Sequence, residues 1–312
     1  ERRIDELVHY PHGCLEQTMS GALPQVFLRK LLPDASEAKL KEADGNVDVA
    51  LNKLRDFQTS SGAFSLWPGE SHAYEWGTLW AGRFLLAAKA AGHTLPASTW
   101  DPYLAHLVDA SARWKPDAYA HRGDTLSQVT RLDILAQAGK ADLPRMNQLR
   151  AANLPDLERW ILGAAYVSAG RKDAGQELAG KAGASYSATR SLGEWLWSDV
   201  RDRGLLLEAM VRVGDEKKAL DLFRTLRANV RDGNIWLSTQ EGGTALWGIA
   251  SWLASHGNGD AFQAQWRVAG GAWQKVSGNK GSAGIAIPAS ASGTLEVMNT
   301  GKGALDALFT RL

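Results

Sequence analysis

The sequence predicts a mainly helical chain that ends in a short antiparallel β segment. Glycine recurs as a stop signal at the ends of helix-like stretches, at intervals of roughly 30 to 50 residues, which is the length of a helix hairpin repeat. From about Phe262 the helical spacing of apolar residues gives way to short alternating runs, separated by turns rich in Gly, Ser and Asn. These two observations place the helices first and the strands last.

The helical stretches share one type of ending, a residue followed by a glycine that can adopt the left-handed conformation. Between these endings, apolar residues recur every three or four positions, so each helix carries one apolar stripe that needs a neighbour. Repeated hairpins bury such stripes either by stacking in a line or by closing into a ring, and the pattern leaves both open. The endings are Ala91-Gly92, Ala138-Gly139, Ala169-Gly170, Val213-Gly214 and His256-Gly257.

The last part of the chain reads as strands at 262–268, 272–276, 284–287 and 294–298. So few strands without a partner sheet make a poor independent unit. We therefore expect half of a β-sandwich, with an exposed edge where the missing strands would pair. The predicted division is a helical domain at 1–260 and a β segment at 261–312.

Composition bounds the function without naming it. Lysine plus arginine number 35 against 34 acidic residues, a net charge of +1, which gives no reason to expect a nucleic acid or an anionic membrane as partner. No stretch is apolar and long enough to span a bilayer. The chain begins at Glu1 without an initiator Met or a signal peptide, so we expect an excised fragment.

The single cysteine lies in a segment where it can reach a side-chain amide. Positions three apart on a helix share a face, so the sulfur of Cys14 can meet the carboxamide of Gln17. Attack of the thiolate on that amide would expel ammonia and leave a Cys-to-Gln thioester. Gly13 removes a β-carbon from the turn before the nucleophile, and Pro11 favours an extended approach to the helix. Holding the two groups together is worth roughly 7 to 11 kcal/mol of barrier.

Three segments resemble motifs of one known family. Residues 10–17, Tyr-Pro-His-Gly-Cys-Leu-Glu-Gln, closely resemble the thioester motif of the α2-macroglobulin and complement superfamily, in its bacterial form. Residues 57–69 are similar to a segment that follows the family's second long helix. Residues 238–246 resemble a pattern near the end of the family's thioester domain, from which Gly242-Gly243-Thr244 departs.

The resemblance implies an architecture and an activity. It implies an α/α toroid, like the ring of terpenoid cyclases and prenyltransferases, followed by the returning half of a CUB-like β domain. The Cys14–Gln17 thioester would acylate a lysine amine of an attacking protease, once per molecule, after cleavage of a bait elsewhere. The chain would thus be a protease inhibitor rather than an enzyme, with proteases and its own further domains as partners. No metal or cofactor is implied, and the expected location is the bacterial periplasm, with a lipid anchor outside this fragment.

Four neighbouring or matching residues are candidates for supporting roles. The Tyr10 ring, just upstream of the motif, is a candidate shield of the thioester against water. His121 lies at a distance from Cys14 similar to that of the family's transacylation histidine, although a helix-start histidine facing solvent is the simpler interpretation. His12 could polarise the thiol or only pack. Glu16 is interpreted as a first-turn carboxylate favoured by the helix dipole.

Other functions remain open at this stage. Cys14 could instead be the nucleophile of a cysteine hydrolase or transglutaminase, which requires a histidine base and an orienting acid or amide. The chain could also be a non-catalytic helical toroid that serves as an interaction module. Its thirteen tryptophans suggest the aromatic cavity of a terpene cyclase or prenyltransferase. However, the aspartate-rich run of those cyclases is missing, and the only cysteine is already in the thioester motif, so the tryptophans read mainly as core.

Overall fold

The computed structural model describes residues 11–33, 35–115, 122–183, 198–231, 236–256, 262–278, 285–287 and 290–301. The chain divides into two compact units, Glu1–Trp252 and Leu253–Leu312. The first unit is helical and the second contains a small antiparallel sheet, so the predicted fold class is confirmed. The sequence-based domain boundary at residue 260 stays a prediction.

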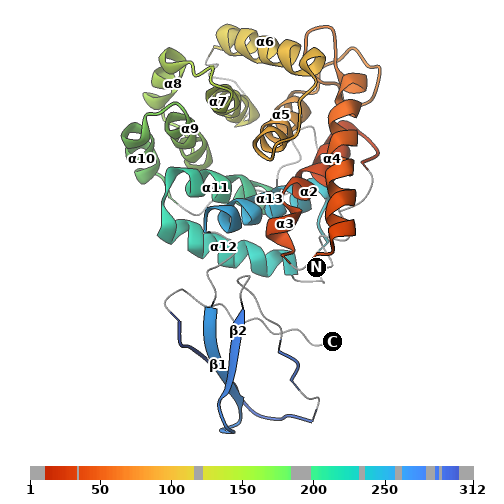
Figure 1. Ribbon diagram of the computed structural model, residues 1–312. Helices are drawn as coiled ribbons and strands as arrows, with labels where there is room; N and C mark the ends of the chain where they lie inside the picture. The colour runs from red at the N-terminus through yellow and green to blue at the C-terminus, as the bar shows by residue number, and fades with distance from the viewer. Residues whose placement is uncertain are drawn as a thin grey trace. The chain divides into compact units, whose positions relative to one another are not determined.

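The helical unit is a ring of paired helices, the α/α toroid that the sequence left open and the family resemblance favoured (Figure 1). The inner helices are α2 (Leu15–Val26), α5 (Glu75–Ala90), α7 (Arg122–Gln137), α9 (Asp156–Ser168), α11 (Asp199–Val213) and α13 (Thr239–Ser255). The outer helices are α4 (Glu37–Phe57), α6 (Ala97–Arg113), α8 (Leu143–Arg150), α10 (Lys172–Gly180) and α12 (Glu216–Arg231). The short helix α3 (Leu28–Leu31) leads from α2 to α4.

The glycine stops of the sequence mark the ends of inner helices. Gly92, Gly139, Gly170 and Gly214 follow α5, α7, α9 and α11, and all four have positive φ. A residue with a β-carbon would be strained there, because the left-handed region is costly for other residues. Each of these four repeats therefore consists of an inner helix, a glycine stop and an outer helix. Gly257, the fifth predicted stop, lies outside the described residues.

The ring closes where α13 fits between α11 and α2. Neighbouring inner helices contact one another in the order α2, α5, α7, α9, α11. On α13, a β-carbon built on Gly243 would lie 2.8 Å from the carbonyl oxygen of Ser20 in α2, and one built on Gly248 would lie 2.6 Å from that of Gly204 in α11. Since real β-carbons do not approach backbone atoms so closely, glycine at these positions lets the helices meet and complete the toroid.

Large aromatic side chains fill the core between the inner helices. Trp76 stacks on Trp80 with ring centroids 6.5 Å apart, and Trp80 meets Trp247 edge-on at 5.8 Å. All three are buried. The interpretation of the tryptophans as core therefore holds for these residues, while Trp195 and Trp197 lie outside the described part of the chain.

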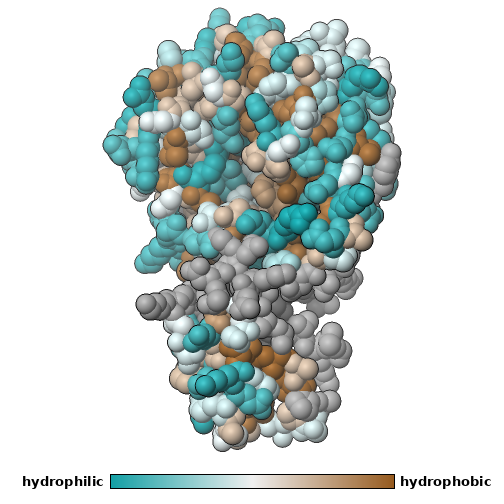
Figure 2. Space-filling view, in the orientation of Figure 1, coloured by the Kyte–Doolittle hydropathy of each residue, from teal (hydrophilic) through white to brown (hydrophobic). Residues whose placement is uncertain are grey.

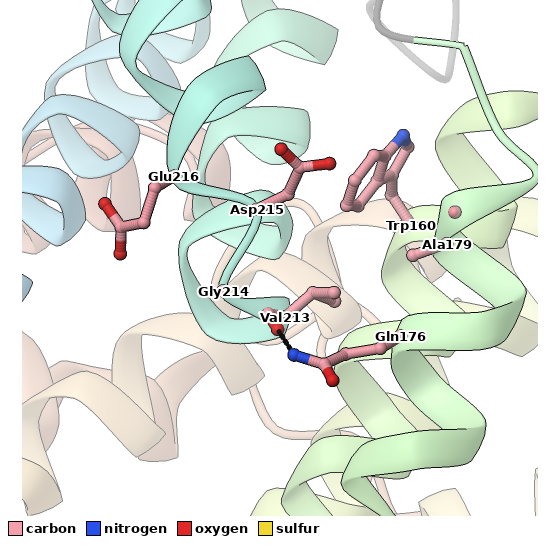
Figure 3. Close-up of a pocket in the computed structure, with 8 residues that line it drawn as sticks. Trp160, Gln176, Ala179, Val213, Gly214, Asp215 and Glu216 are labelled. Carbon is pink, nitrogen blue, oxygen red and sulfur yellow. Dashed lines mark hydrogen bonds between the residues drawn. The ribbon is translucent and has the colours of Figure 1, made fainter.

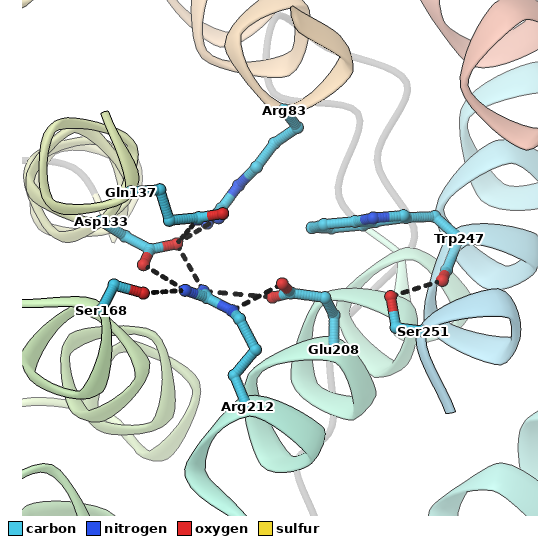
Figure 4. Close-up of polar contacts among 8 residues, drawn as sticks. All are labelled: Arg83, Asp133, Gln137, Ser168, Glu208, Arg212, Trp247 and Ser251. Carbon is cyan, nitrogen blue, oxygen red and sulfur yellow. Dashed lines mark hydrogen bonds and ion pairs between the residues drawn. The ribbon is translucent and has the colours of Figure 1, made fainter. Parts of the chain in front are cut away.

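A buried ionic cluster joins the C-terminal halves of several inner helices (Figure 4). Asp133 of α7, fully buried, binds Arg83 of α5 and accepts hydrogen bonds of 2.7 and 2.8 Å from Arg212 of α11. Arg212 also donates to Ser168, the last residue of α9, at 2.9 Å. Because residues near the C-terminal ends of α7, α9 and α11 converge here, these three helices are parallel to one another.

The second unit contains a three-stranded antiparallel sheet in the order β2-β1-β3. Its strands are β1 (Phe262–Val268), β2 (Gln274–Gly278) and β3 (Leu295–Asn299), and Trp266 lies opposite both Gln274 and Val297. The prediction of a strand at 284–287 is wrong, because residues 285–287 form no strand and pair with none of the described strands. Among the described residues, β2 and β3 each leave one edge unpaired, and Figure 2 shows hydrophobic residues gathered on the visible face of this unit.

Candidate functional site

The N-terminus of α2 brings Cys14 and Gln17 together. Cys14 is the N-cap residue, with an extended backbone (φ −69°, ψ 171°), and Gln17 occupies the third helical position. Two reciprocal hydrogen bonds join them: the Cys14 N–H donates to Oε1 of Gln17 at 3.2 Å, and the backbone N–H of Gln17 donates to the sulfur of Cys14. This is the geometry of a capping box, with a thiol in the place of the usual hydroxyl. The nucleophile and the amide that it would attack are thus held side by side.

Gly13 makes this approach possible. Its φ is 90°, in the left-handed region that favours glycine. A β-carbon built at this position would clash with Oε1 of Gln17 and lie 3.1 Å from the carboxamide carbon. The glycine is therefore needed twice, once for the backbone turn and once for the space that the carboxamide occupies.

The surroundings of the pair favour the protonated thiol of Cys14 and polarise the carboxamide of Gln17. Burial is the largest effect and raises the pKa of the Cys14 thiol, and the negative charge of Glu16 raises that pKa further; backbone N–H groups of Gln17 and Glu16 act in the opposite direction. The Cys14 N–H at Oε1 of Gln17 would stabilise the negative charge that develops on this oxygen during attack. The arrangement can therefore support acyl transfer through the Gln17 carbonyl.

The second sequence motif holds the start of α2 in place. Residues 57–69 form a loop after α4, in which Gln58 pairs with Phe64 in an isolated β-bridge and the Ser65 N–H donates to the carbonyl of Phe57 at 2.8 Å. The next residue, Leu66, accepts a hydrogen bond of 2.9 Å from the backbone N–H of Leu15. That N–H is one of the groups at a helix N-terminus that have no partner within the helix. The second motif thus supplies the missing acceptor directly after Cys14.

The third sequence motif, near the C-terminal end of the helical unit, also contacts the first turn of α2. Ser238 and Glu241 form a capping box at the start of α13: the Ser238 N–H donates to the Glu241 carboxylate at 2.7 Å, and the Glu241 N–H donates to the Ser238 hydroxyl at 3.2 Å. Between them, the hydroxyl of Thr239 donates to the two carboxylate oxygens of Glu16 at 3.0 and 3.2 Å. All three motifs therefore meet around the first turn of α2.

The predicted site residues differ in exposure. Gln17 and His12 are exposed, and Cys14 is half-buried. Tyr10, the predicted shield, and His121, the predicted transacylation histidine, lie outside the described residues. The assignment of Cys14 and Gln17 as the reacting pair stays a prediction that this geometry supports.

Sequence reasoning missed the role of Glu16. It is in the first turn of α2 as expected, but only 7% of it is exposed, and it accepts hydrogen bonds from Ser20 at 2.6 Å and from Thr239. Burial raises the pKa of this carboxyl group, although the two hydroxyl donors oppose that rise. The capping-box pattern Ser-x-x-Glu at 238–241 was the available signal for the start of α13, but nothing local pointed from Thr239 to Glu16.

A cavity of about 290 Å³ lies elsewhere, where α9 and α10 meet the turn from α11 to α12 (Figure 3). Trp160, Asp215 and Glu216 are among its lining residues, and Gln176 donates to the carbonyl of Val213 at 3.1 Å across one side. Neither Cys14 nor Gln17 lines it. Within the described ranges, no group of three or more His, Cys, Asp or Glu side chains could hold a metal ion, and no helix is long and apolar enough to cross a membrane.

Comparison with known proteins finds similarity to one family. The model of the A-macroglobulin TED domain matches residues 1–107, which include the Cys14–Gln17 pair and the second motif. The chain is also 28% identical over 264 residues to the α2-macroglobulin of Escherichia coli strain K12, an alignment that covers 77% of this chain. The resemblance to α2-macroglobulins that the sequence motifs indicated is confirmed.

Solved structures of α2-macroglobulins share the fold. The structure of the native E. coli protein matches 96% of this chain with a TM-score of 0.70 and 23% identity. The matched region is 18% of the E. coli chain. A Salmonella α2-macroglobulin reacted with methylamine matches over 96% of this chain and 20% of its own, with a TM-score of 0.67 and 23% identity. The chain thus corresponds to a small part of these relatives, 15% of the length of the E. coli protein in the sequence alignment.

Proposed function

We propose that this chain is the thioester domain of a longer, bacterial α2-macroglobulin-like protein that traps proteases covalently. The observation that carries the proposal is the reciprocal hydrogen bonding of Cys14 and Gln17 over Gly13. A thiol held against a carboxamide, with a backbone N–H on the amide oxygen, has the arrangement needed to form a thioester. Similarity to the α2-macroglobulins, whose thioester motif this segment resembles, supports the same chemistry.

The reaction has two steps. In the first, the Cys14 thiolate attacks the carboxamide carbon of Gln17, a C–S bond forms, the C–N bond breaks, and the nitrogen leaves as ammonia after taking up a proton. In the second, a lysine amine of a target protease attacks the same carbon, the C–S bond breaks, and the sulfur leaves as a thiolate or thiol. The products are an isopeptide bond to the protease and a free Cys14. Because the thioester is consumed, the protein acts once and is an inhibitor rather than an enzyme.

Relatives with solved structures support the partner. One E. coli α2-macroglobulin structure is described as trypsin activated, and the Salmonella protein is described as reacted with methylamine, a small primary amine. For this chain we infer that proteases are the targets, that the cleaved bait and other supporting domains belong to the rest of the full-length protein, and that it works in the periplasm, attached by a lipid outside this chain. No cofactor or metal enters either step.

Intact mass spectrometry of the full-length protein tests the proposal. The native protein should weigh less than its sequence by one ammonia, and methylamine should add its own mass and release one thiol that reagents can titrate. Cys14→Ser should restore the sequence mass and abolish covalent protease capture, whereas Lys115→Arg, a conservative change at another position of the chain, should change neither. A freely alkylatable Cys14 in the native protein, unaffected by methylamine and accompanied by repeated turnover, would favour a cysteine hydrolase or transglutaminase instead.

A further inference from the structure

Glu16 is a buried acid with no cation beside it among the residues that the structure describes. Among the described residues, the groups that bond its carboxylate are hydroxyls: Ser20 at 2.6 Å and Thr239 at 3.0 and 3.2 Å. Removing a carboxylate from water is costly, and neutral hydroxyl donors offset only part of that cost. An apolar residue would fill a position of pure packing more cheaply. A carboxylate at this position, one residue from Gln17 and two from Cys14, therefore indicates a role in the site.

The hydroxyls that hold Glu16 are themselves fixed by neighbouring inner helices. Ser20 accepts a hydrogen bond of 3.0 Å from the indole N–H of Trp80 in α5, and Trp80 is buried against Trp247 of α13. Thr239 is the first residue of α13, inside the capping box formed by Ser238 and Glu241. The position of the Glu16 carboxylate is consequently set by α5 and α13 together, and not by α2 alone.

The Glu16 carboxylate acts on the reacting pair by geometry and by charge. It ties the first turn of α2 to α13, and that turn carries Gln17 and the N–H groups directed at the Cys14 sulfur. Its negative charge opposes the build-up of negative charge on that sulfur. A thiol of higher pKa leaves more slowly from a thioester. Both effects would keep a formed thioester intact until an acceptor amine arrives.

We propose that Glu16 is a positioning residue for the Cys14–Gln17 pair. Its buried carboxylate, anchored to the N-terminus of α13 through Thr239, fixes the first turn of α2 and slows the departure of the Cys14 sulfur. This inference rests on the proposed thioester chemistry. It gives the third sequence motif a role in that chemistry, because Thr239 positions the Glu16 carboxylate, which slows cleavage of the thioester.

The test compares variants of the full-length protein with methylamine as the probe. Glu16→Gln removes the charge and keeps the shape, and Thr239→Val removes the hydroxyl that anchors the acid. Thr239→Ser restores that hydroxyl. Ser251→Ala is the matched control, because Ser251 lies on the same helix as Thr239 and its hydroxyl donates to the carbonyl of Trp247 in that helix, at 2.9 Å. The measurements are the fraction of molecules that lack one ammonia, the rate of thiol release, and the pH at which the released Cys14 becomes alkylatable.

Glu16→Gln should accelerate thiol release at least about threefold and shift the alkylation profile of Cys14 to lower pH, because a neutral neighbour no longer opposes the thiolate. Thr239→Val should lower the fraction of molecules with a thioester, and Thr239→Ser should restore it. Ser251→Ala should match the wild type within about twofold in every measurement.

Two results would overturn the inference. One is a Glu16→Gln protein with the thioester fraction, release rate and alkylation profile of the wild type. The other is a change of melting temperature alone, with rate and profile unaltered, since that is the signature of a purely structural residue. A wild-type protein that never lacks ammonia would overturn the proposed function itself, so the two failures are separate observations.

Discussion

The carboxamide of Gln17 lies in the space beside Gly13 that a β-carbon would fill. The clash would be with Oε1, the oxygen that accepts the Cys14 N–H, so any side chain at position 13 displaces the amide that the thiol must attack. Gly13 is thus needed to make room for the carboxamide. This need for space can be tested separately from the need for a left-handed backbone, which any glycine turn shares.

Gly13→Ala should prevent most of the thioester from forming. The substitution imposes left-handed strain of about 1 to 2 kcal/mol and also pushes the carboxamide out of reach of the sulfur. The measurement is the fraction of the full-length protein that lacks one ammonia. We expect that fraction to fall at least about tenfold.

Gly69→Ala is the control for Gly13→Ala. Gly69 also has positive φ, 78°, but nothing lies within 4 Å of the position of its β-carbon. It should suffer the strain and keep the thioester. Equal loss of the thioester in both variants would mean that backbone strain alone, and not the space taken by Gln17, explains the effect.

The sequence predicted the parts of the fold that depend on local chemistry. Gly92 and Gly214 are recognisable as helix ends because left-handed backbone selects glycine whatever the rest of the chain does. The Cys14–Gln17 pair is recognisable because three residues of helix bring the two groups together. In each case the partners are close in sequence.

Features that depend on distant partners could not be predicted in this way. Thr239 and Glu16 are 223 positions apart, and only closure of the ring brings them within hydrogen-bond distance. A strand was wrongly predicted at Ile285 and Ile287, because their alternation with a small residue is typical of a strand. A strand also needs a neighbour to pair with, and the described sheet offers residues 285–287 none.

The raised pKa of Glu16 predicts an unusual dependence of stability on pH. A carboxyl group whose pKa is higher in the folded than in the unfolded state favours folding when protonated, so its contribution to stability falls as pH rises from the unfolded value, about 4.3, through the folded one. Glu16→Gln removes this penalty. The variant should therefore melt at the same or a higher temperature than the wild type at pH 7.5, and the difference should shrink below pH 4.

Thermal melts of both proteins across this pH range check the prediction. A Glu16→Gln protein that is clearly less stable at pH 7.5 and closes the gap on acidification would contradict it, because that sign belongs to a carboxylate that stabilises the fold. We expect greater stability together with a faster-reacting thioester. This is the trade-off between stability and function that is common at functional sites.

Gly204→Ala should weaken closure of the ring. A β-carbon on Gly204 of α11 would lie 2.6 Å from the carbonyl carbon of Thr244 and 2.9 Å from the nitrogen of Ala245, both backbone atoms of α13. Backbone cannot move aside as a flexible side chain can, so the free energy of unfolding should fall by about 1 to 3 kcal/mol. Urea denaturation followed by circular dichroism measures it. Gly45→Ala in α4, where the added carbon meets open space, should instead stabilise by about 0.5 to 1 kcal/mol.

Asp133→Asn should destabilise the ring more than the glycine substitutions do. It leaves the buried charges of Arg83 and Arg212 beside a neutral amide. Burial alone would raise the pKa of Asp133, but the charges of Arg212 and Arg83 outweigh burial and hold it below its usual value. The stabilisation from this carboxylate is therefore present above the unfolded pKa, about 3.9, and is lost as pH falls below it towards the folded value. At pH 7 the substitution should cost about 3 to 5 kcal/mol in urea denaturation.

The matched control is Asp109→Asn in α6, whose carboxylate pairs with Arg113 on the surface, where both side chains are more than half exposed. Solvent screens that pair, so its loss should cost less than about 0.5 kcal/mol. The wild type should lose stability on acidification below pH 4, and Asp133→Asn should lose less over the same range, because the titrating group is gone. Equal costs for the two substitutions would show that the ionic cluster at the centre of the ring contributes no more than a surface pair. In that case closure of the toroid would depend on its apolar core and on the glycine contacts of α13.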